Sequence, residues 1–286
     1  MLIEVKCNLC GGNEFEVLKD VKISPLGGET KLVKCKRCEL LYLNPRYDEE
    51  EERKYYASHY FEKDTFEIWG DERVDIFKHN LKMLRKYKEN GKLLDLGCGV
   101  GQFLKVAKDN GWDALGLDIS KRATEKARRI FNVEVVESSI EDANLKSDSF
   151  DVVIALNIID QLSDPFGALK EIYRVLKKGG IVLIRVPNAK FQIFYYDILR
   201  IIGKICRIKV RLQKPPVFHN YMFSPKTAKA MLKKTGFGDM EILNSRLSIK
   251  NKIIENVVYF ISEVIYYLTF KRYVTTPSML VFAWKD

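Results

Sequence analysis

The stretch KLLDLGCGVGQFLKVAKDNGW, residues 92–112, decides the fold of this 286-residue chain. An apolar run with Leu93, Leu94 and Leu96 enters a turn of three alternating glycines, and apolar residues at helical spacing follow the turn. A strand, a glycine turn and a helix in this order form a βα unit, whose loop lets a ligand come close to the backbone. The sequence therefore predicts a ligand site at the carboxyl end of this strand.

A second predicted strand, in DALGLDIS, supplies the next acid of the site. It ends at Asp118, which lies 23 residues after Asp95, where a ribose-binding carboxylate is expected. Two ligand classes compete at the glycine turn. A dinucleotide fingerprint requires Gly-x-Gly-x-x-Gly, whereas the glycines here alternate and Gln102 follows the last of them. Asp95 stands two residues before the first glycine, where it repels a pyrophosphate and suits a cationic amino or sulfonium group.

At these residues the chain resembles the class I S-adenosylmethionine-dependent methyltransferases. The resemblance runs from about residue 92 to residue 286 and includes LLDLGCGVG, GLDIS, SFDVVIALNIIDQLSDP, EIYRVLKKGGIVLIRVPN and PSMLVFAWKD. It implies an α/β fold, a Rossmann-like sheet of seven mostly parallel strands with helices on both faces. The segment SMLVFAW fits the last strand, which is antiparallel in that family. A Rossmann-like domain that binds another nucleotide is the alternative.

The resemblance also implies which residues contact S-adenosylmethionine. The glycine loop borders the methionine and ribose part, Asp95 orients the amino end, and Asp118 accepts hydrogen bonds from the ribose hydroxyls. Ile119 packs on adenine, the loop with Ser139 and Ile140 meets the adenine edge, and Asn157 lies near the methionine part. The cofactor-binding set expected in this way is Asp95, Gly97, Gly99, Gly101, Asp118, Ile119, Ser139, Ile140 and Asn157.

Four of the six cysteines form two Cys-x-x-Cys pairs near the N-terminus, Cys7 with Cys10 and Cys35 with Cys38. Two such pairs can supply four thiolates to one tetrahedral zinc ion. Short β-like runs between the pairs indicate a zinc ribbon, and a unit of this size needs the metal to stay folded. Four sulfur ligands leave no open position for a substrate, so we expect a structural zinc. Four reduced cysteines without metal are the alternative.

Three parts are expected along the chain: a zinc ribbon over 1–45, a helical linker or lid over 46–90, and a methyltransferase domain over 91–286 with insertions at about 189–222 and 249–274. A ribbon, a tyrosine-bearing helix and this domain together are similar to zinc-ribbon methyltransferases that act on sugars and other small metabolites. That resemblance implies that Tyr56 and Tyr60 cover the cofactor. Packing of these rings on the domain is the alternative.

Catalysis by methyl transfer rests largely on positioning, and a hydroxyl or acidic C–H nucleophile also requires a general base. Many members of the resembling family carry an acid-histidine pair after the fourth strand, where this chain has Asp160 and Gln161. Because glutamine takes no proton at neutral pH, His219 in the stretch FHNYMFSP becomes the candidate base, with Asp160 as the alternative. Tyr221 in the same stretch is a third candidate catalytic residue. A purely structural role for His219 remains open.

The net charge of +10 comes from one region, since residues 190–252 carry 14 Lys or Arg against three acids. Within it, DILRIIGKICRIKVRL predicts a cationic amphipathic helix, with Arg200, Lys204, Arg207 and Arg211 on one face. A second apolar insertion, NKIIENVVYFISEVIYYLTFKR, separates the last two predicted strands. The two segments form either a lid or dimer contact, or a cap that meets an anionic membrane surface. Neither a signal peptide nor a spanning helix is expected, which favours a cytoplasmic protein, peripheral at the inner membrane surface if the cap binds lipid.

The leading function is methyl transfer to a small-molecule acceptor: a sugar, a sugar-nucleotide or a lipid-linked glycan. An RNA methyltransferase that uses the ribbon and the basic patch is the alternative, because both features can bind nucleic acid. The ribbon segment between the cysteine pairs is not basic, so nucleic acid is the less favoured partner. A binding module that keeps the cofactor fold without turnover is the third reading.

Overall fold

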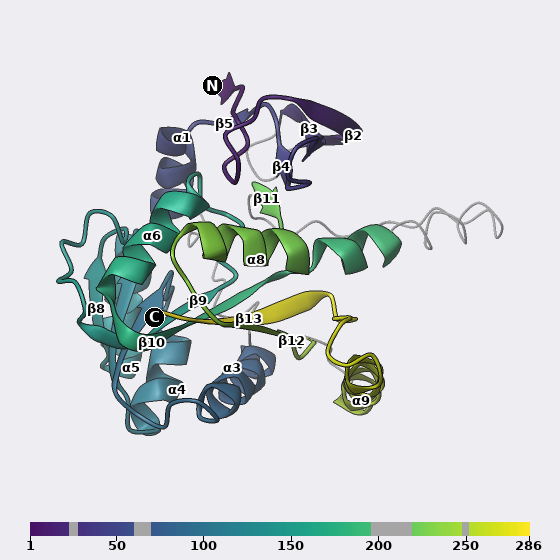
Figure 1. The fold of residues 1–286 in the computed structure, drawn as a ribbon. Helices are drawn as coiled ribbons and strands as arrows, with labels where there is room; N and C mark the ends of the chain where they lie inside the picture. The colour runs from purple at the N-terminus through teal and green to yellow at the C-terminus, as the bar shows by residue number, and fades with distance from the viewer. Residues whose placement is uncertain (23–27, 60–69, 196–218, 248–251) are drawn as a thin grey trace.

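The computed structural model describes residues 1–22, 28–59, 70–195, 219–247 and 252–286. Its centre is a seven-stranded sheet in the order β12-β13-β10-β9-β6-β7-β8 (Figure 1). Five strands run parallel, and β13 is antiparallel to both of its neighbours. The strands are β6 (Lys92–Leu96), β7 (Asp113–Asp118), β8 (Glu134–Glu137), β9 (Phe150–Leu156), β10 (Leu176–Pro187), β12 (Met240–Asn244) and β13 (Ser278–Trp284). The expected seven-stranded Rossmann-like sheet with an antiparallel last strand is confirmed.

Helices cover both faces of the sheet because successive strand residues point to opposite sides. Val153 and Ala155 of β9 pack with helices α6 (Pro165–Val175) and α8 (Pro225–Lys234). Val152 and Ile154 pack on the other face with helices α3 (Gly70–Leu84), α4 (Gln102–Asp109) and α9 (Lys252–Leu268). Helix α5 (Lys121–Phe131) lies beside α4 near β8.

Side-chain caps fix the starts of several helices. Asp164 caps α6, whose first residue is a proline, and Ser224 forms a capping box with Thr227 at the start of α8. The acidic run expected to open a helix does so: Asp48 caps α1 (Glu49–Lys54), with four glutamates in its first turn. A π-helical turn, η1 (Tyr55–His59), continues from α1.

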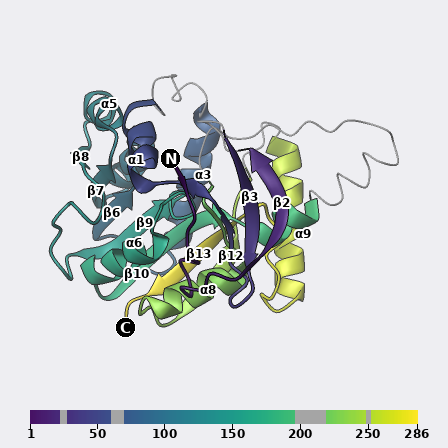
Figure 2. The ribbon, with the colours of Figure 1, turned by 90° about the horizontal axis from the view of Figure 1, so that it is seen from above.

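The N-terminal module shares a sheet with the methyltransferase part of the chain. Strands β2 (Phe15–Lys22), β3 (Glu29–Cys35) and β4 (Leu41–Leu43) form an antiparallel sheet whose fourth strand is β11 (Tyr221–Met222). A separate two-stranded pair joins β1 (Leu2–Ile3) to β5 (Arg46–Tyr47). Figure 2 shows this module lying across the sheet beside α8. The stretch around His219 is thus held by the cysteine module, a link between segments almost 180 residues apart in the sequence.

Two expectations about the insertions have different outcomes. The amphipathic helix expected around Arg200 to Arg211 lies outside the described residues. The second insertion forms α9 between β12 and β13, at the edge of the molecule (Figures 1 and 2). Among the described residues, no helix is both long and apolar enough to cross a membrane.

Candidate active site and cysteine cluster

A cavity of about 490 Å³ opens at the carboxyl ends of β6, β7, β9 and β10. Its volume lies in the range of small-molecule and cofactor sites, and ligands bind at this edge of open α/β sheets. Helices α1 and α3 and the turn η1 contribute to its wall. The expected cofactor residues that line it are Asp95, Gly97, Gly99, Asp118, Ile119, Ser139, Ile140 and Asn157.

The glycine loop needs its glycines for different physical reasons. Gly97 has φ +69°, and a Cβ there would come within 3.0 Å of the Ile158 side chain below the cavity floor. Gly101 has φ +80° and precedes α4, and a Cβ there would lie 2.9 Å from Ala127 of α5. Gly101 is not among the residues that line the cavity. It allows α4 and α5 to pack closely and so sets the position of the loop.

Two acids lie beside this loop. Asp118 accepts hydrogen bonds from the backbone N–H of Gly99 (2.8 Å) and of Ser120 (2.9 Å), which orient the carboxylate at the cavity. Burial raises the pKa of Asp118 to about 6. Burial, and then the negative charge of Asp118, raise the pKa of Asp95 well above its usual value. Two buried acids favour a ligand that brings hydroxyl donors and positive charge.

His219 reaches the cavity from the far side of the chain and contacts Asp160. Its Nδ1 lies 2.6 Å from Oδ2 of Asp160, whose carboxyl group is fully buried, while a third of the imidazole remains exposed. The second oxygen of Asp160, Oδ1, has no hydrogen-bond partner. His219 lines the cavity and Asp160 does not, so Asp160 lies behind the imidazole as its orienting partner.

Tyr221, the third expected catalytic residue, points away from the cavity. It is 1% exposed, donates a hydrogen bond to the carbonyl oxygen of Ser163 and lies under the guanidinium of Arg46. Burial raises its pKa to about 12. Its backbone N–H donates to the carbonyl oxygen of Asp160 (3.0 Å), so the residue fastens strand β11 to the loop after β9.

Several site residues escaped the sequence-based reasoning. Tyr56 of η1 donates a hydrogen bond to Gln161, whose amide donates to the carbonyl oxygen of Asn157. Arg185 also lines the cavity, and its guanidinium donates to Oδ1 of Asn157 (2.6 Å). A usable signal existed for Arg185, because a charged residue interrupts the otherwise apolar strand IVLIRVPN.

The four module cysteines converge. Their Sγ atoms all lie within 4.8 Å of one another, with 3.4 Å between Cys7 and Cys38 and 3.5 Å between Cys10 and Cys35. A tetrahedron with zinc–sulfur bonds of about 2.3 Å has sulfur–sulfur edges of about 3.8 Å, so the cluster is close to the geometry that zinc requires. None of these cysteines forms a disulfide. The residues therefore fit one zinc ion held by four thiolates.

Comparison with known proteins agrees with this geometry. The family profile described as "Methyltransferase domain" matches residues 68–242. The ubiquinone biosynthesis O-methyltransferase of Aliivibrio fischeri strain ES114 is 26% identical over 157 residues, which cover 53% of this chain and 65% of that protein. The chain thus matches slightly less than two thirds of that relative's length.

Solved structures share the fold. A possible histamine N-methyltransferase from Thermotoga maritima has a TM-score of 0.54 at 23% identity, covering 78% of this chain and 95% of the other. Phosphoethanolamine N-methyltransferase 2 of Haemonchus contortus, solved with S-adenosyl-L-methionine, has a TM-score of 0.54 at 18% identity, covering 86% of this chain and 62% of the other. These relatives differ in acceptor, so the likeness extends to the fold and the cofactor-binding architecture.

Proposed function

The chain belongs to the methyltransferase-domain family and is an S-adenosylmethionine-dependent enzyme, and we propose that it methylates a hydroxyl group of a small-molecule acceptor. The observation that carries the proposal is the pair of His219 and Asp160 at the cavity, 2.6 Å apart. A nucleophile that must lose a proton benefits from such a pair, whereas an amine that is already neutral does not need one.

When bound, S-adenosylmethionine supplies an electrophilic methyl group on a positively charged sulfonium. The cofactor-binding residues named above hold and orient it, with the Asp118 carboxylate toward the ribose and Asp95 toward the amino end. Asp160 accepts the Nδ1–H of His219, which leaves Nε2 unprotonated and able to take the acceptor's hydroxyl proton. Asp160 also stabilises the imidazolium that forms, because its buried carboxylate lies beside the new charge.

Replacement of the pair tests the proposal. We expect His219→Gln and Asp160→Asn to lower methyl transfer by about 10²- to 10⁴-fold, the usual contribution of a general base, while the Kd for S-adenosylhomocysteine changes less than about twofold. Asp109→Asn, an exposed acid at the end of α4, serves as the matched control. Full transfer by His219→Gln would return this histidine to a structural role.

For the acceptor we propose a sugar, a sugar-nucleotide or a lipid-linked glycan. The support is the similarity of the ribbon, the tyrosine-bearing helix and the methyltransferase domain to enzymes of that kind. Incubation of the protein with methyl-labelled cofactor and a fractionated lysate distinguishes the acceptors. Label in the nucleotide-sugar or glycolipid fraction is the expected result, and label in RNA would favour the RNA methyltransferase instead.

We also propose that α9 contacts an anionic membrane surface. One face of α9 packs on the sheet through buried Tyr266, which donates a hydrogen bond to the carbonyl oxygen of Ile242. Other apolar side chains of the helix and its end face outward, namely Ile253, Ile254, Val257, Phe260, Ile261, Tyr267, Leu268 and Phe270. Lys271 and Arg272 follow directly, and basic residues beside an apolar helix face suit anionic lipid.

Vesicle flotation tests the membrane contact. We expect the protein to float with vesicles that contain phosphatidylglycerol and to stay in solution with phosphatidylcholine vesicles. The variant Phe260→Ser/Leu268→Ser removes two exposed apolar side chains of α9 and should lose most of the flotation. Equal flotation of this variant and the parent protein would refute a contact through α9.

For the cysteine cluster we propose one structural zinc ion per chain, bound by Cys7, Cys10, Cys35 and Cys38. The support is the convergence of four sulfurs at near-tetrahedral spacing. Elemental analysis of the purified protein should give one zinc per chain, and well below one would reject the site. We further propose that residues 1–45, 46–90 and 91–286 act as ribbon, cofactor cover and catalytic domain.

A further inference from the structure

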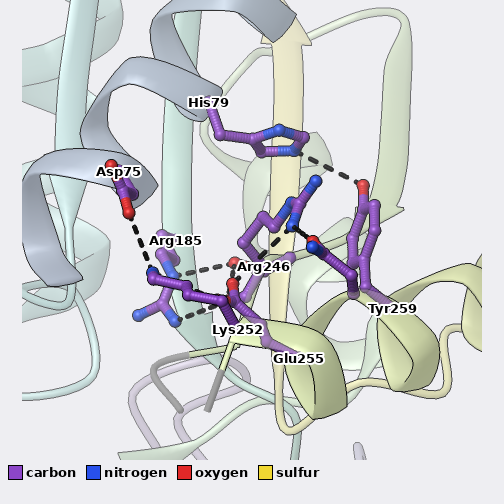
Figure 3. Close-up of polar contacts among 9 residues, drawn as sticks. Asp75, His79, Arg185, Arg246, Lys252, Glu255 and Tyr259 are labelled. Carbon is purple, nitrogen blue, oxygen red and sulfur yellow. Dashed lines mark hydrogen bonds and ion pairs between the residues drawn. The ribbon is translucent and has the colours of Figure 1, made fainter. Parts of the chain in front are cut away.

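Arg185 brings a positive charge into the cavity without an acidic partner. Its Nε donates to the Ser245 hydroxyl (2.8 Å), Nη1 to the Asn157 side-chain oxygen (2.6 Å) and Nη2 to the Arg246 carbonyl oxygen (3.4 Å). Figure 3 shows Arg185 reaching the backbone that precedes α9. All three acceptors are neutral. Within the described part of the chain, no carboxylate lies within ion-pair distance of this guanidinium.

The neighbouring charges leave this cation uncompensated. Burial, and next the positive charge of Arg73, lower the pKa of Arg185 to about 10, and Asp160 is the acid that acts in the opposite direction. Asp160 is already engaged with His219. Arg246, close by, has such a partner, since its guanidinium lies 3.8 Å from Glu255 (Figure 3). Removing a cation from water without a counter-charge is unfavourable, so a ligand anion would restore the balance.

The position in the sheet separates Arg185 from the expected adenosine site. Asp118 ends β7, the glycine loop follows β6, and Arg185 lies on β10, beyond β9. Neighbouring strands are about 4.8 Å apart, so two strand spacings of roughly 10 Å separate Arg185 from the glycine loop. The pair of His219 and Asp160 follows β9, between the two positions. Arg185 is therefore on the acceptor side of the reacting atoms.

We propose that Arg185 binds a carboxylate or phosphate group of the acceptor and so places the acceptor's nucleophile beside His219. The inference rests on the proposed function and adds that the acceptor is an anion. A guanidinium has five N–H donors, and three of those of Arg185 are used by the protein. One N–H on each Nη remains, which is the pair that can bind two oxygens of one oxyanion.

The test titrates inorganic phosphate and, separately, acetate into the full chain saturated with S-adenosylhomocysteine, with binding measured by calorimetry. We expect millimolar binding of at least one oxyanion to the parent protein and to Arg129→Gln, an exposed control on α5. In Arg185→Gln this binding should weaken at least tenfold, while the Kd for S-adenosylhomocysteine stays within about twofold. The two arms separate a phosphate-bearing acceptor from a carboxylate-bearing one.

Three results would overturn the proposal. The first is absence of oxyanion binding to the parent protein, and the second is equal binding by Arg185→Gln. The third is a tenfold loss of S-adenosylhomocysteine affinity in Arg185→Gln, which would assign Arg185 to the cofactor's own carboxylate. If Arg185→Gln does not fold, Arg185→Lys decides: loss of the forked donor pair should weaken acetate binding about threefold or more, and unchanged binding refutes the proposal. Intact S-adenosylhomocysteine binding without oxyanion binding would leave the proposed methyl transfer standing.

Discussion

Replacement of Asn220 by alanine tests how the cysteine module, α1 and the candidate base are joined. The Asn220 side chain is 1% exposed and donates to both carboxylate oxygens of Glu52 (2.9 Å each) and to the carbonyl oxygen of Gln161 (2.9 Å). Glu52 is 3% exposed, and burial raises its pKa. A hydrogen bond to a charged group contributes about 1.5–3 kcal/mol, so Asn220→Ala should lower the free energy of unfolding by about 2–3 kcal/mol.

A double-mutant cycle with Glu52→Ala isolates this contact. Urea unfolding of the four proteins should give a coupling energy of about 1.5–3 kcal/mol between the two positions. Asn220→Asp places a second carboxyl group against Glu52, so its deficit should be largest near neutral pH, where both groups are ionised, and shrink toward pH 4 as they take up protons. A coupling energy below about 0.5 kcal/mol would refute the reasoning.

The same substitution has a functional readout, because Asn220 is adjacent to His219. Its carbonyl oxygen accepts from the backbone N–H of Leu43 in β4 (3.0 Å), so the residue connects the module sheet to the candidate base. We expect Asn220→Ala to reduce methyl transfer while S-adenosylhomocysteine binding stays intact. Reduced cofactor binding together with reduced transfer would indicate general loosening of the domain instead.

Three further predictions concern the cofactor site and the module. Cofactor binding should weaken as pH falls below about 6, because the Asp118 carboxylate, with its pKa raised to about 6, must be ionised to accept from the ribose. Methylthioadenosine titrated by calorimetry from pH 5 to 8 checks this, and Asp118→Asn should bind more weakly with no such pH dependence. Gly101→Val should lower stability by about 3 kcal/mol in urea unfolding, since φ is +80° and its Cβ would meet Ala127. Cys35→Ser should abolish stoichiometric zinc; a loss of only about 3 kcal/mol would lower Tm by roughly 6–12 °C in calorimetry, and an unchanged Tm would contradict a structural metal.

Local sequence pattern was sufficient for the sheet and for the cofactor side of the site. The glycine loop and Asp118 lie at the ends of strands whose apolar runs are continuous in the sequence, so their chemistry is determined within about 25 residues. The capped start of α8 at Ser224 was equally visible, because the capping box is a local arrangement. The two Cys-x-x-Cys pairs indicated one four-sulfur site from spacing alone.

The acceptor side depended on tertiary structure. The contact between His219 and Asp160 spans 59 residues, and no periodicity reports which acid a distant histidine meets. Pairing of β11 with β4 brings residues near positions 42 and 221 together, and it turns Tyr221 inward as an anchor. Arg185 was visible as a charge within an apolar strand, but the lack of an acidic partner emerges only when its surroundings are folded around it. Cofactor chemistry was thus encoded locally, whereas the base and the charge offered to the acceptor are products of long-range packing.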